Sequence, residues 1–186
     1  IDDLLELTRL EDSHLALDLQ TVDAGSLLEE VAEAWRVRVD QQGARLNVEP
    51  AQGLSLQADV HLLSRVFSNL IGNALRHAGA GVTIDLRARA SSDPPGVAFT
   101  VADDGVGISP AHHEVVFRKF SALSKPGARA SSGLGLTFCK LAVEAHGGQI
   151  WLESRDGEGS AFHFALPSVP PAPRSGPSSL LEAIET

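Results

Sequence analysis

The sequence contains no methionine and only one cysteine, and aromatic residues make up 5% of its 186 residues. A single cysteine excludes an internal disulfide framework and a zinc site built from cysteines. No apolar run approaches the roughly 18 residues of a membrane-spanning helix, so the sequence predicts no transmembrane segment. It also lacks a secretory signal. Because methionine is missing even at position 1, we expect the chain to be a piece of a longer protein.

Basic side chains are scarce. Fifteen Lys and Arg residues stand against 24 Asp and Glu residues, which gives a net charge of −9. This balance disfavours non-specific DNA binding or an anionic membrane surface, and we expect no nucleic-acid partner. Hydrophobic residues at 43% and charged residues at 21% are compatible with a folded core. The length fits one domain with a short extension.

Glycine and proline are present but unevenly distributed. Nine of the 17 glycines lie between Gly105 and Gly159, and five of the ten prolines lie between Pro167 and Pro177. Glycine concentrates where the backbone needs a positive φ or approaches a ligand closely. The proline-rich and serine-rich composition of residues 168–186 predicts a disordered tail or linker.

The periodicity of apolar residues predicts the order helix, strand pair, helix, hairpin, loop, helix, hairpin. Residues 45–49 and 54–58 are expected to form the strand pair, and residues 121–132 the loop. Antiparallel strands interrupted by helices predict an α+β layer, with helices on one face of a mixed sheet. The expected helices span 23–42, 59–77, 110–117 and 134–146, and the expected strands span 15–19, 45–49, 54–58, 82–90, 97–102, 149–154 and 161–166.

The helix expected at 59–77 carries amide side chains beside its apolar stripe. Asn69 and Asn73 are four residues apart, and Arg76 and His77 follow one turn later, so the four fall in an arc of roughly 100°. Asparagine is a poor residue for a helix interior. One interpretation is a solvated polar edge of the helix. The other is a hard-cation site, in which side-chain carbonyl oxygens bind Mg²⁺ together with phosphates and water.

Two glycine-containing segments offer a similar choice. In the segment 101–108 an apolar strand runs into Asp103, Gly105 and Gly107, which suits either an Asp-Gly turn or a ligand site. In the second case Asp103 would accept a hydrogen bond from a ligand amine, and a ring would lie against bare backbone. Gly133 and Gly135 precede a helix, where backbone amides favour an anion and glycines let phosphate approach; a loop hinge is the alternative interpretation. Neither segment matches a Walker A loop or a dinucleotide fingerprint.

Taken together, these motifs resemble the N, G1, F and G2 boxes of the catalytic, ATP-binding domain of sensor histidine kinases. They occur in that order, and the resemblance extends over residues 23–167, including the closing segment from Gly157 to Phe162. The boxes are formed by Asn69/Asn73, Asp103-x-Gly105-x-Gly107, Phe117/Phe120 and Gly133-x-Gly135. The resemblance implies a Bergerat fold, a two-layer α/β sandwich in which a mixed, mostly antiparallel sheet packs on about three helices beneath a flexible ATP lid.

The resemblance also implies a domain organisation and a set of roles. Residues 1–14 would end the second dimerisation helix, residues 15–167 would form the catalytic domain, and residues 168–186 would be the tail. Asn73, assisted by Asn69, would hold Mg²⁺. Arg76 would meet the phosphates, His77 would stack near the adenine, and Asp103 would bind the adenine amine. The full set implied to bind ATP is Asn69, Asn73, Arg76, His77, Asp103, Gly105, Gly107, Ile108, Phe117, Phe120, Lys125, Ser132, Gly133, Leu134, Gly135 and Leu136, with Asn69, Asn73 and Arg76 as the catalytic residues.

Asn69 separates this chain from the related hydrolases. Those enzymes carry a glutamate at this position as a general base for water, and asparagine cannot take up a proton. Transfer of the γ-phosphoryl group to a supplied nucleophile is therefore expected instead of hydrolysis. The implied acceptor is a histidine on a dimerisation domain, which then serves a response regulator. The implied parent protein is a homodimer located in the cytoplasm, either free or as the cytoplasmic part of a membrane-bound kinase.

Three departures from the family pattern leave two alternatives. Ser131 replaces the first glycine of the G2 box, and Ala122 stands where many members carry an arginine. The acceptor motif, a histidine followed by an acidic residue and a proline, is missing. The alternatives are a nucleotide-sensing or protein-binding module without kinase activity, and a serine kinase of the anti-sigma type. The helical spacing of residues 1–12 argues against the second, because such kinases lack a preceding dimerisation hairpin.

Overall fold

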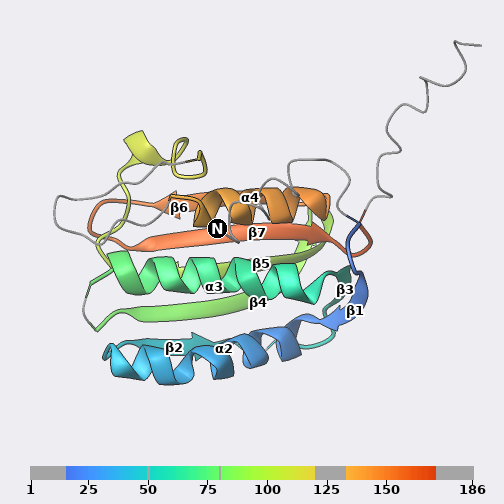
Figure 1. The fold of residues 1–186 in the computed structure, drawn as a ribbon, viewed down its shortest axis with the longest axis horizontal. Helices are drawn as coiled ribbons and strands as arrows, with labels where there is room; N and C mark the ends of the chain where they lie inside the picture. Colours follow the sequence, from blue (N-terminus) through green and yellow to red (C-terminus); the bar gives the residue numbers. More distant parts are fainter. Residues whose placement is uncertain (1–15, 50, 80, 120–132, 171–186) are drawn as a thin grey trace, which may run out of the picture.

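A computed structural model of the chain describes residues 16–49, 51–79, 81–119 and 133–170. Three helices cover one face of a five-stranded sheet, and each helix runs roughly along the strands beneath it (Figure 1). The predicted α+β sandwich is therefore confirmed. In chain order the elements are β1 (Gln20–Asp23), α2 (Ala24–Gln41), β2 (Arg45–Val48), β3 (Ser55–Ala58), α3 (Val60–His77), β4 (Thr83–Ser92), β5 (Pro95–Asp103), the 3₁₀ turn η1 (Pro110–His112), α4 (Gly135–Ala145), β6 (Gln149–Ser154) and β7 (Ser160–Pro167).

The five-stranded sheet has the order β2-β4-β5-β7-β6. Only β2 and β4 are parallel, and the other neighbours are antiparallel. The prediction that β2 and β3 pair with each other is wrong, because β3 pairs with β1 in a separate two-stranded sheet. Alternating apolar residues specify that a segment is a strand and which of its faces is buried. They do not specify its partner, which depends on the packing of the whole layer.

Two aspartates set the starts of the long helices. The side chain of Asp23 accepts a hydrogen bond from the backbone N–H of Ser26 at 2.8 Å, and Asp59 accepts one from Leu62 at 3.1 Å. Each aspartate satisfies a backbone donor that has no partner within its helix. This fixes where α3 begins, and hence which of its residues reach the far end of the sheet.

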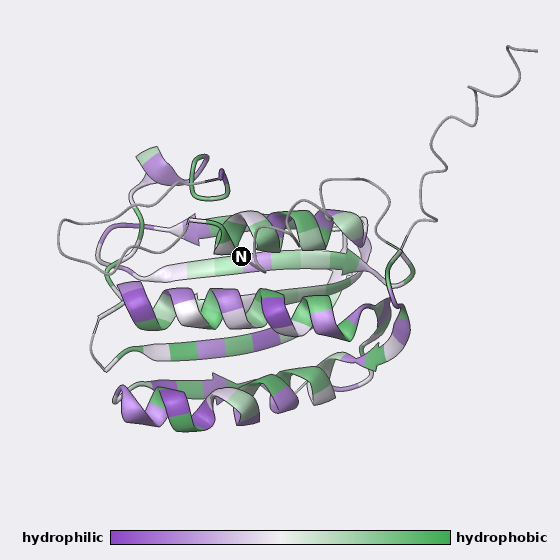
Figure 2. Ribbon diagram, in the orientation of Figure 1, coloured by the Kyte–Doolittle hydropathy of each residue, from purple (hydrophilic) through white to green (hydrophobic). Residues whose placement is uncertain are grey.

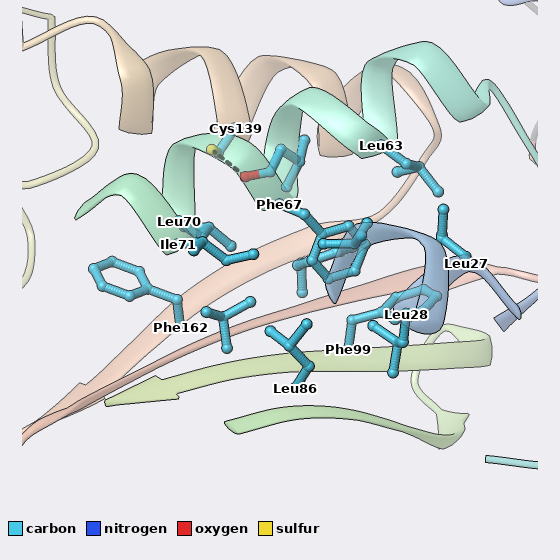
Figure 3. Close-up of a cluster of buried hydrophobic side chains, with 14 of the residues drawn as sticks. Leu27, Leu28, Leu63, Phe67, Leu70, Ile71, Leu86, Phe99, Cys139 and Phe162 are labelled. Atoms are coloured by element: carbon cyan, nitrogen blue, oxygen red, sulfur yellow. Dashed lines mark hydrogen bonds between the residues drawn. The ribbon is translucent and has the colours of Figure 1, made fainter. Parts of the chain in front are cut away.

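The centre of the core is an aromatic cluster between α3 and the sheet. The ring of Phe67 on α3 lies 5.6 Å from that of Phe99 on β5 and 5.3 Å from that of Phe164 on β7. Figure 3 shows Phe67 and its neighbours Leu70 and Ile71 on α3 above the strands. The packing holds α3 over β5 and β7, so that the last turn of α3 comes close to the end of β5.

The helices differ in how hydrophobic they are. Figure 2 shows α4 as mostly hydrophobic, whereas α2 carries hydrophilic residues along much of its length. Cys139 on α4 is fully buried and its thiol donates to the carbonyl oxygen of Val66 at 3.7 Å, so the single cysteine is a small residue of the core. No helix in the described ranges is both long enough and apolar enough to cross a membrane.

Two smaller predictions differ from the structure. The first described strand is Gln20–Asp23 and not 15–19, and the helix expected at 110–117 is a 3₁₀ turn at Pro110–His112 followed by further turns. There the backbone N–H groups of His113 and Arg118 bond to carbonyls three residues back, which is the tighter 3₁₀ pattern. The expected dimerisation-helix segment 1–14 and most of the expected tail lie outside the described residues.

Candidate functional site

A cavity opens where the last turns of α3 meet the end of β5 and the start of β7. Five of the predicted site residues line it: Asn73 and His77 from α3, and Asp103, Gly107 and Ile108 from the end of β5 and the turn after it. The aromatic core holds these two segments together, although 30 residues separate Asn73 from Asp103 in the sequence. The complete lining consists of Asn73, Ala74, His77, Ala78, Asp103, Val106, Gly107, Ile108, Ser160 and Phe162.

The amide side chains of α3 lie between the cavity and the start of α4. Asn73 lines the cavity, and its Oδ1 accepts a hydrogen bond from Arg76 Nη2 at 3.4 Å. Asn69 lies one turn earlier, and its Oδ1 is 2.9 Å from the position that a Cβ on Gly135 would take. Gly135 therefore lets the first turn of α4 approach Asn69. The structure thus brings together two motifs that are more than 60 residues apart.

Two adjacent aspartates at the end of β5 have different surroundings. Asp103 lines the cavity, and its Oδ1 accepts a hydrogen bond from the backbone N–H of Gly105 at 3.0 Å. Burial raises the pKa of the Asp103 carboxyl, while backbone hydrogen bonds from Gly105 and Ser160 oppose that rise. Asp104 is exposed and accepts from the backbone N–H of Thr83 at 2.6 Å. It joins β5 to β4 and does not line the cavity.

The glycines of the turn are required mainly by the chain's own packing. A Cβ on Gly105 would overlap Ala78 at the end of α3, and Gly105 is not among the lining residues. Gly107 has φ +72°, and a Cβ there would overlap the carbonyl oxygen of Arg155. Bare backbone at these positions thus allows the turn to pack against α3 and against the β6–β7 hairpin. Gly105 shapes the cavity indirectly through this packing, whereas Gly107 also lines it.

Ser160 and Phe162 line the cavity but were not among the predicted site residues. The closing segment 157–162 was the available clue, yet its spacing does not say which side chains face inward. The hydroxyl of Ser154 connects this segment to the turn. It accepts from the backbone N–H of Ile108 at 2.7 Å, donates to the carbonyl of Gly159 at 2.6 Å, and lies 3.1 Å from Ser160 Oγ.

The predicted lid residues are only partly described. The ring centre of Phe117 lies 6.2 Å from that of Phe162, so Phe117 packs behind the wall of the cavity. The backbone carbonyl of Phe117 accepts a hydrogen bond from Thr137 Oγ1 at 3.2 Å. Gly133 has φ +64°, a conformation that favours glycine, and it precedes the buried Leu134 and the half-buried Leu136 at the start of α4. Phe120, Lys125 and Ser132 lie outside the described residues.

The oxygen ligands available at the cavity suit a hard cation of which most ligands are water or substrate and only one or two are protein side chains. Across the described ranges, no three His, Cys, Asp or Glu side chains are grouped as a metal cluster. An amide oxygen such as that of Asn73 matches Mg²⁺, which typically takes one or two protein ligands together with water and substrate phosphates. Burial lowers the pKa of His77, with a further contribution from Arg76, so its ring is held towards the neutral form.

The sheet, its single layer of helices and a cavity between α3 and the end of β5 that combines apolar walls with Asn73, His77 and Asp103 define a Bergerat-type ATP-binding domain. The sequence model of the histidine kinase-, DNA gyrase B- and HSP90-like ATPases matches residues 58–170, which is more than half of the chain. The chain belongs to this family.

Individual relatives agree with this assignment. Over 172 residues the chain is 36% identical to the adaptive-response sensory kinase SasA of Synechococcus sp. (strain JA-2-3B'a(2-13)), and the match covers 90% of this chain and 44% of SasA. The structure of full-length ShkA in complex with AMPPNP has a TM-score of 0.76 and 30% identity, covering 91% of this chain and 35% of ShkA. The catalytic domain of the histidine kinase ThkA has a TM-score of 0.72 at 24% identity, covering 83% of this chain and 100% of the ThkA domain, and supports the fold alone. The chain thus spans less than half the length of SasA.

Proposed function

We propose that this chain is the ATP-binding catalytic domain of a sensor histidine kinase. It would transfer the γ-phosphoryl group of ATP to a histidine on a dimerisation domain. The observation that carries the proposal is the cavity that joins Asn73 and His77 of α3 with Asp103 at the end of β5. The nucleotide analogue bound by ShkA and the kinase names of the relatives support the same function.

Each end of the cavity suits one part of ATP. The carboxylate of Asp103 accepts from Gly105 through one oxygen, and as an acceptor it fits the exocyclic amine of adenine. At the other end, Asn73, assisted by Asn69, would hold Mg²⁺, which supplies positive charge that offsets the charge of the phosphates. Arg76 would contact the phosphates. Because the net charge of −9 opposes an anionic ligand, affinity must come from such locally placed groups.

The side chains around the cavity favour transfer over hydrolysis. Within the described part of the chain, Asp103 is the only carboxylate of the lining, and Asn69 occupies the position of the general base in related hydrolases. Neither residue is suited to take a proton from water next to the phosphates. His113 Nε2 lies 2.9 Å from the carbonyl oxygen of Ile108 and thus has a structural partner. No histidine of this sequence is followed by an acidic residue and then a proline in the pattern of the acceptor motif, so the acceptor is proposed to lie on a separate dimerisation domain.

The proposal includes a domain organisation and partners. Residues 15–167 would form the catalytic domain, between the end of a dimerisation helix at 1–14 and a tail at 168–186. The end of β7 at Pro167 supports the second boundary. The acceptor domain and a response regulator would be the protein partners, within a homodimeric parent protein whose catalytic part lies in the cytoplasm. Nucleic acid is not proposed as a partner.

Calorimetric titration with Mg-ATP tests the nucleotide site. We expect the wild-type chain to bind, and Asn73→Ala to bind at least tenfold more weakly because it loses the amide oxygen proposed for Mg²⁺. Asn47→Ala is the matched control, because Asn47 is exposed on β2 and its amide donates to Asp85. Absence of binding by the wild type, or equal binding by Asn73→Ala, would refute the site.

A second experiment tests the reaction. The chain is mixed with the separate dimerisation domain of its parent protein and radiolabelled ATP, and acid-labile phosphate on histidine is measured. We expect labelling that depends on Asn73 and on the acceptor histidine. Nucleotide binding by the full-length protein without such labelling would favour the alternative, a nucleotide-sensing module without kinase activity.

A further inference from the structure

Gly72 occupies a position in α3 where a glycine is unexpected. It lies in the interior of the helix and is buried, and no turn or positive φ calls for glycine there. Glycine destabilises a helix interior relative to alanine. A Cβ at this position would lie 3.2 Å from Nη1 of Arg76 and 3.6 Å from Cη2 of Trp35, with no other neighbour closer than the Arg76 guanidinium carbon at 3.9 Å. The space that a side chain would take is therefore bordered by the Arg76 guanidinium and the edge of the indole ring.

Trp35 is held in this position from two further sides. It comes from α2, and its indole N–H donates to Ser68 Oγ on α3 at 3.4 Å. The guanidinium carbon of Arg38 lies 5.1 Å from the centre of the ring, which is a cation–π geometry. The ring is thus a fixed surface between α2 and α3, and not a freely rotating side chain.

Arg76 connects this surface to the cavity. Its Nη1 lies over Gly72, and its Nη2 donates to Oδ1 of Asn73, which lines the cavity. The Arg38 guanidinium lies over the Trp35 ring, and the Arg76 guanidinium and the edge of the same ring border one space above Gly72. Two cations thus flank the indole, an arrangement that a nearby anion would stabilise.

We propose that Gly72 and Trp35 form a niche that positions the Arg76 guanidinium beside Asn73, and so determines how strongly the phosphates of the nucleotide are bound. This inference rests on the proposed function. Gly72 and Trp35 act through Arg76 and are positioning residues, not ligands. A pre-positioned guanidinium loses less side-chain entropy when it binds phosphate than a free one. It also makes the strong charge-assisted hydrogen bonds typical of Arg–phosphate pairs.

Gly72→Ala separates this role from a merely structural one, because the two readouts should change in opposite directions. The added methyl improves helix propensity, and the atoms that it approaches are the end of a long side chain and a ring edge. We therefore expect the melting temperature to stay the same or to rise by about 2–4 °C. The methyl also displaces the guanidinium, so we expect the Kd for Mg-ATP to increase about five- to tenfold. The Kd for adenosine, measured by chemical-shift titration, should not change, because adenosine has no phosphate.

Three further variants complete the test. Trp35→Phe keeps an aromatic ring but shortens it, and should weaken Mg-ATP binding in the same selective way. Arg76→Ala should weaken it at least as much. Ser64→Ala, another substitution on α3 that improves helix propensity, is the matched control and should leave both affinities unchanged.

The outcomes distinguish the inference from the function on which it rests. No Mg-ATP binding by the wild type would refute the proposed function itself. If the wild type binds, the niche is refuted when Gly72→Ala binds Mg-ATP as tightly as the wild type or more tightly. It is also refuted when the Kd values for adenosine and Mg-ATP rise by the same factor, or when Arg76→Ala has no effect.

Discussion

Removal of a single hydroxyl, that of Ser154, should weaken both the fold and the nucleotide site. The hydroxyl accepts from Ile108 N–H at 2.7 Å and donates to the carbonyl of Gly159 at 2.6 Å. In Ser154→Ala both backbone groups lose this partner in a half-buried position. An unsatisfied donor or acceptor costs about 1–3 kcal/mol, and water replaces part of it here. We therefore expect a loss of about 2–3 kcal/mol in the free energy of unfolding, or roughly 5–10 °C in melting temperature.

Ser154→Ala should also weaken binding of the adenine base of the nucleotide, without affecting the contacts to its phosphates. Ile108 and Ser160 both line the cavity, and Ser154 holds the two segments that carry them. When these segments are no longer fixed, about 1.4 kcal/mol of binding is lost, which corresponds to a tenfold increase in Kd. The increase should be the same for adenosine, ADP and ATP, because the change lies at the end of the cavity proposed for the adenine.

Urea unfolding and calorimetric titration measure the two effects. Ser55→Ala is the matched control, because Ser55 is exposed on β3 and away from the cavity. Ser154→Thr retains a hydroxyl and should recover part of both losses. The reasoning is refuted if Ser154→Ala stays within about 0.5 kcal/mol of the wild type, the range of ordinary surface substitutions, and binds nucleotide normally.

Two further predictions concern the fold around the site. His146 is fully buried, with Nδ1 2.7 Å from the carbonyl of Ala142 and Nε2 accepting from Asp59 N–H at 3.0 Å, so only the neutral ring with its proton on Nδ1 satisfies both partners. Burial lowers the pKa of His146, so its contribution to stability should be complete above about pH 6.5 and be lost as the pH falls towards the lowered pKa of the folded state. In urea unfolding from pH 8 to pH 5, the free energy of unfolding should therefore fall less in His146→Gln than in the wild type. An equal fall in the two proteins would contradict this. Gly105→Ala forces a methyl into Ala78, so the free energy of unfolding should fall by about 1–3 kcal/mol and Mg-ATP binding should weaken. Gly157→Ala, where a Cβ meets no neighbour but φ is +81°, should lose only the roughly 1–2 kcal/mol of backbone strain and should bind Mg-ATP normally. A Gly105→Ala chain as stable as the wild type would show that the turn is not packed against α3 as described.

The sequence predicted α3 well because its determinants are local. Asp59 caps the helix, and the apolar residues that face the core recur at helical spacing. That spacing also places Asn69 and Asn73 on one side, so the candidate metal ligands could be named without coordinates. Asp103 could also be predicted, since the end of an apolar strand can be recognised in the sequence.

The pairing of the strands and several residues of the site could not be predicted from the sequence. The alternation in β2 and β3 is the same whether they pair with each other or, as here, with β4 and β1. Ser160 was missed as a lining residue because inward or outward orientation depends on how β7 pairs with β5.

The sequence by itself determined the class of this protein, because ordered motifs of amides, aspartate and glycine reflect chemistry that each short segment carries alone. The tertiary structure decided what those residues touch. It showed that Gly105 is needed for packing against Ala78, and that Gly72 accommodates Arg76 beside Trp35. Contacts of this kind join residues from different elements, and they exist only once the helices have packed on the sheet and the chain has brought distant segments together.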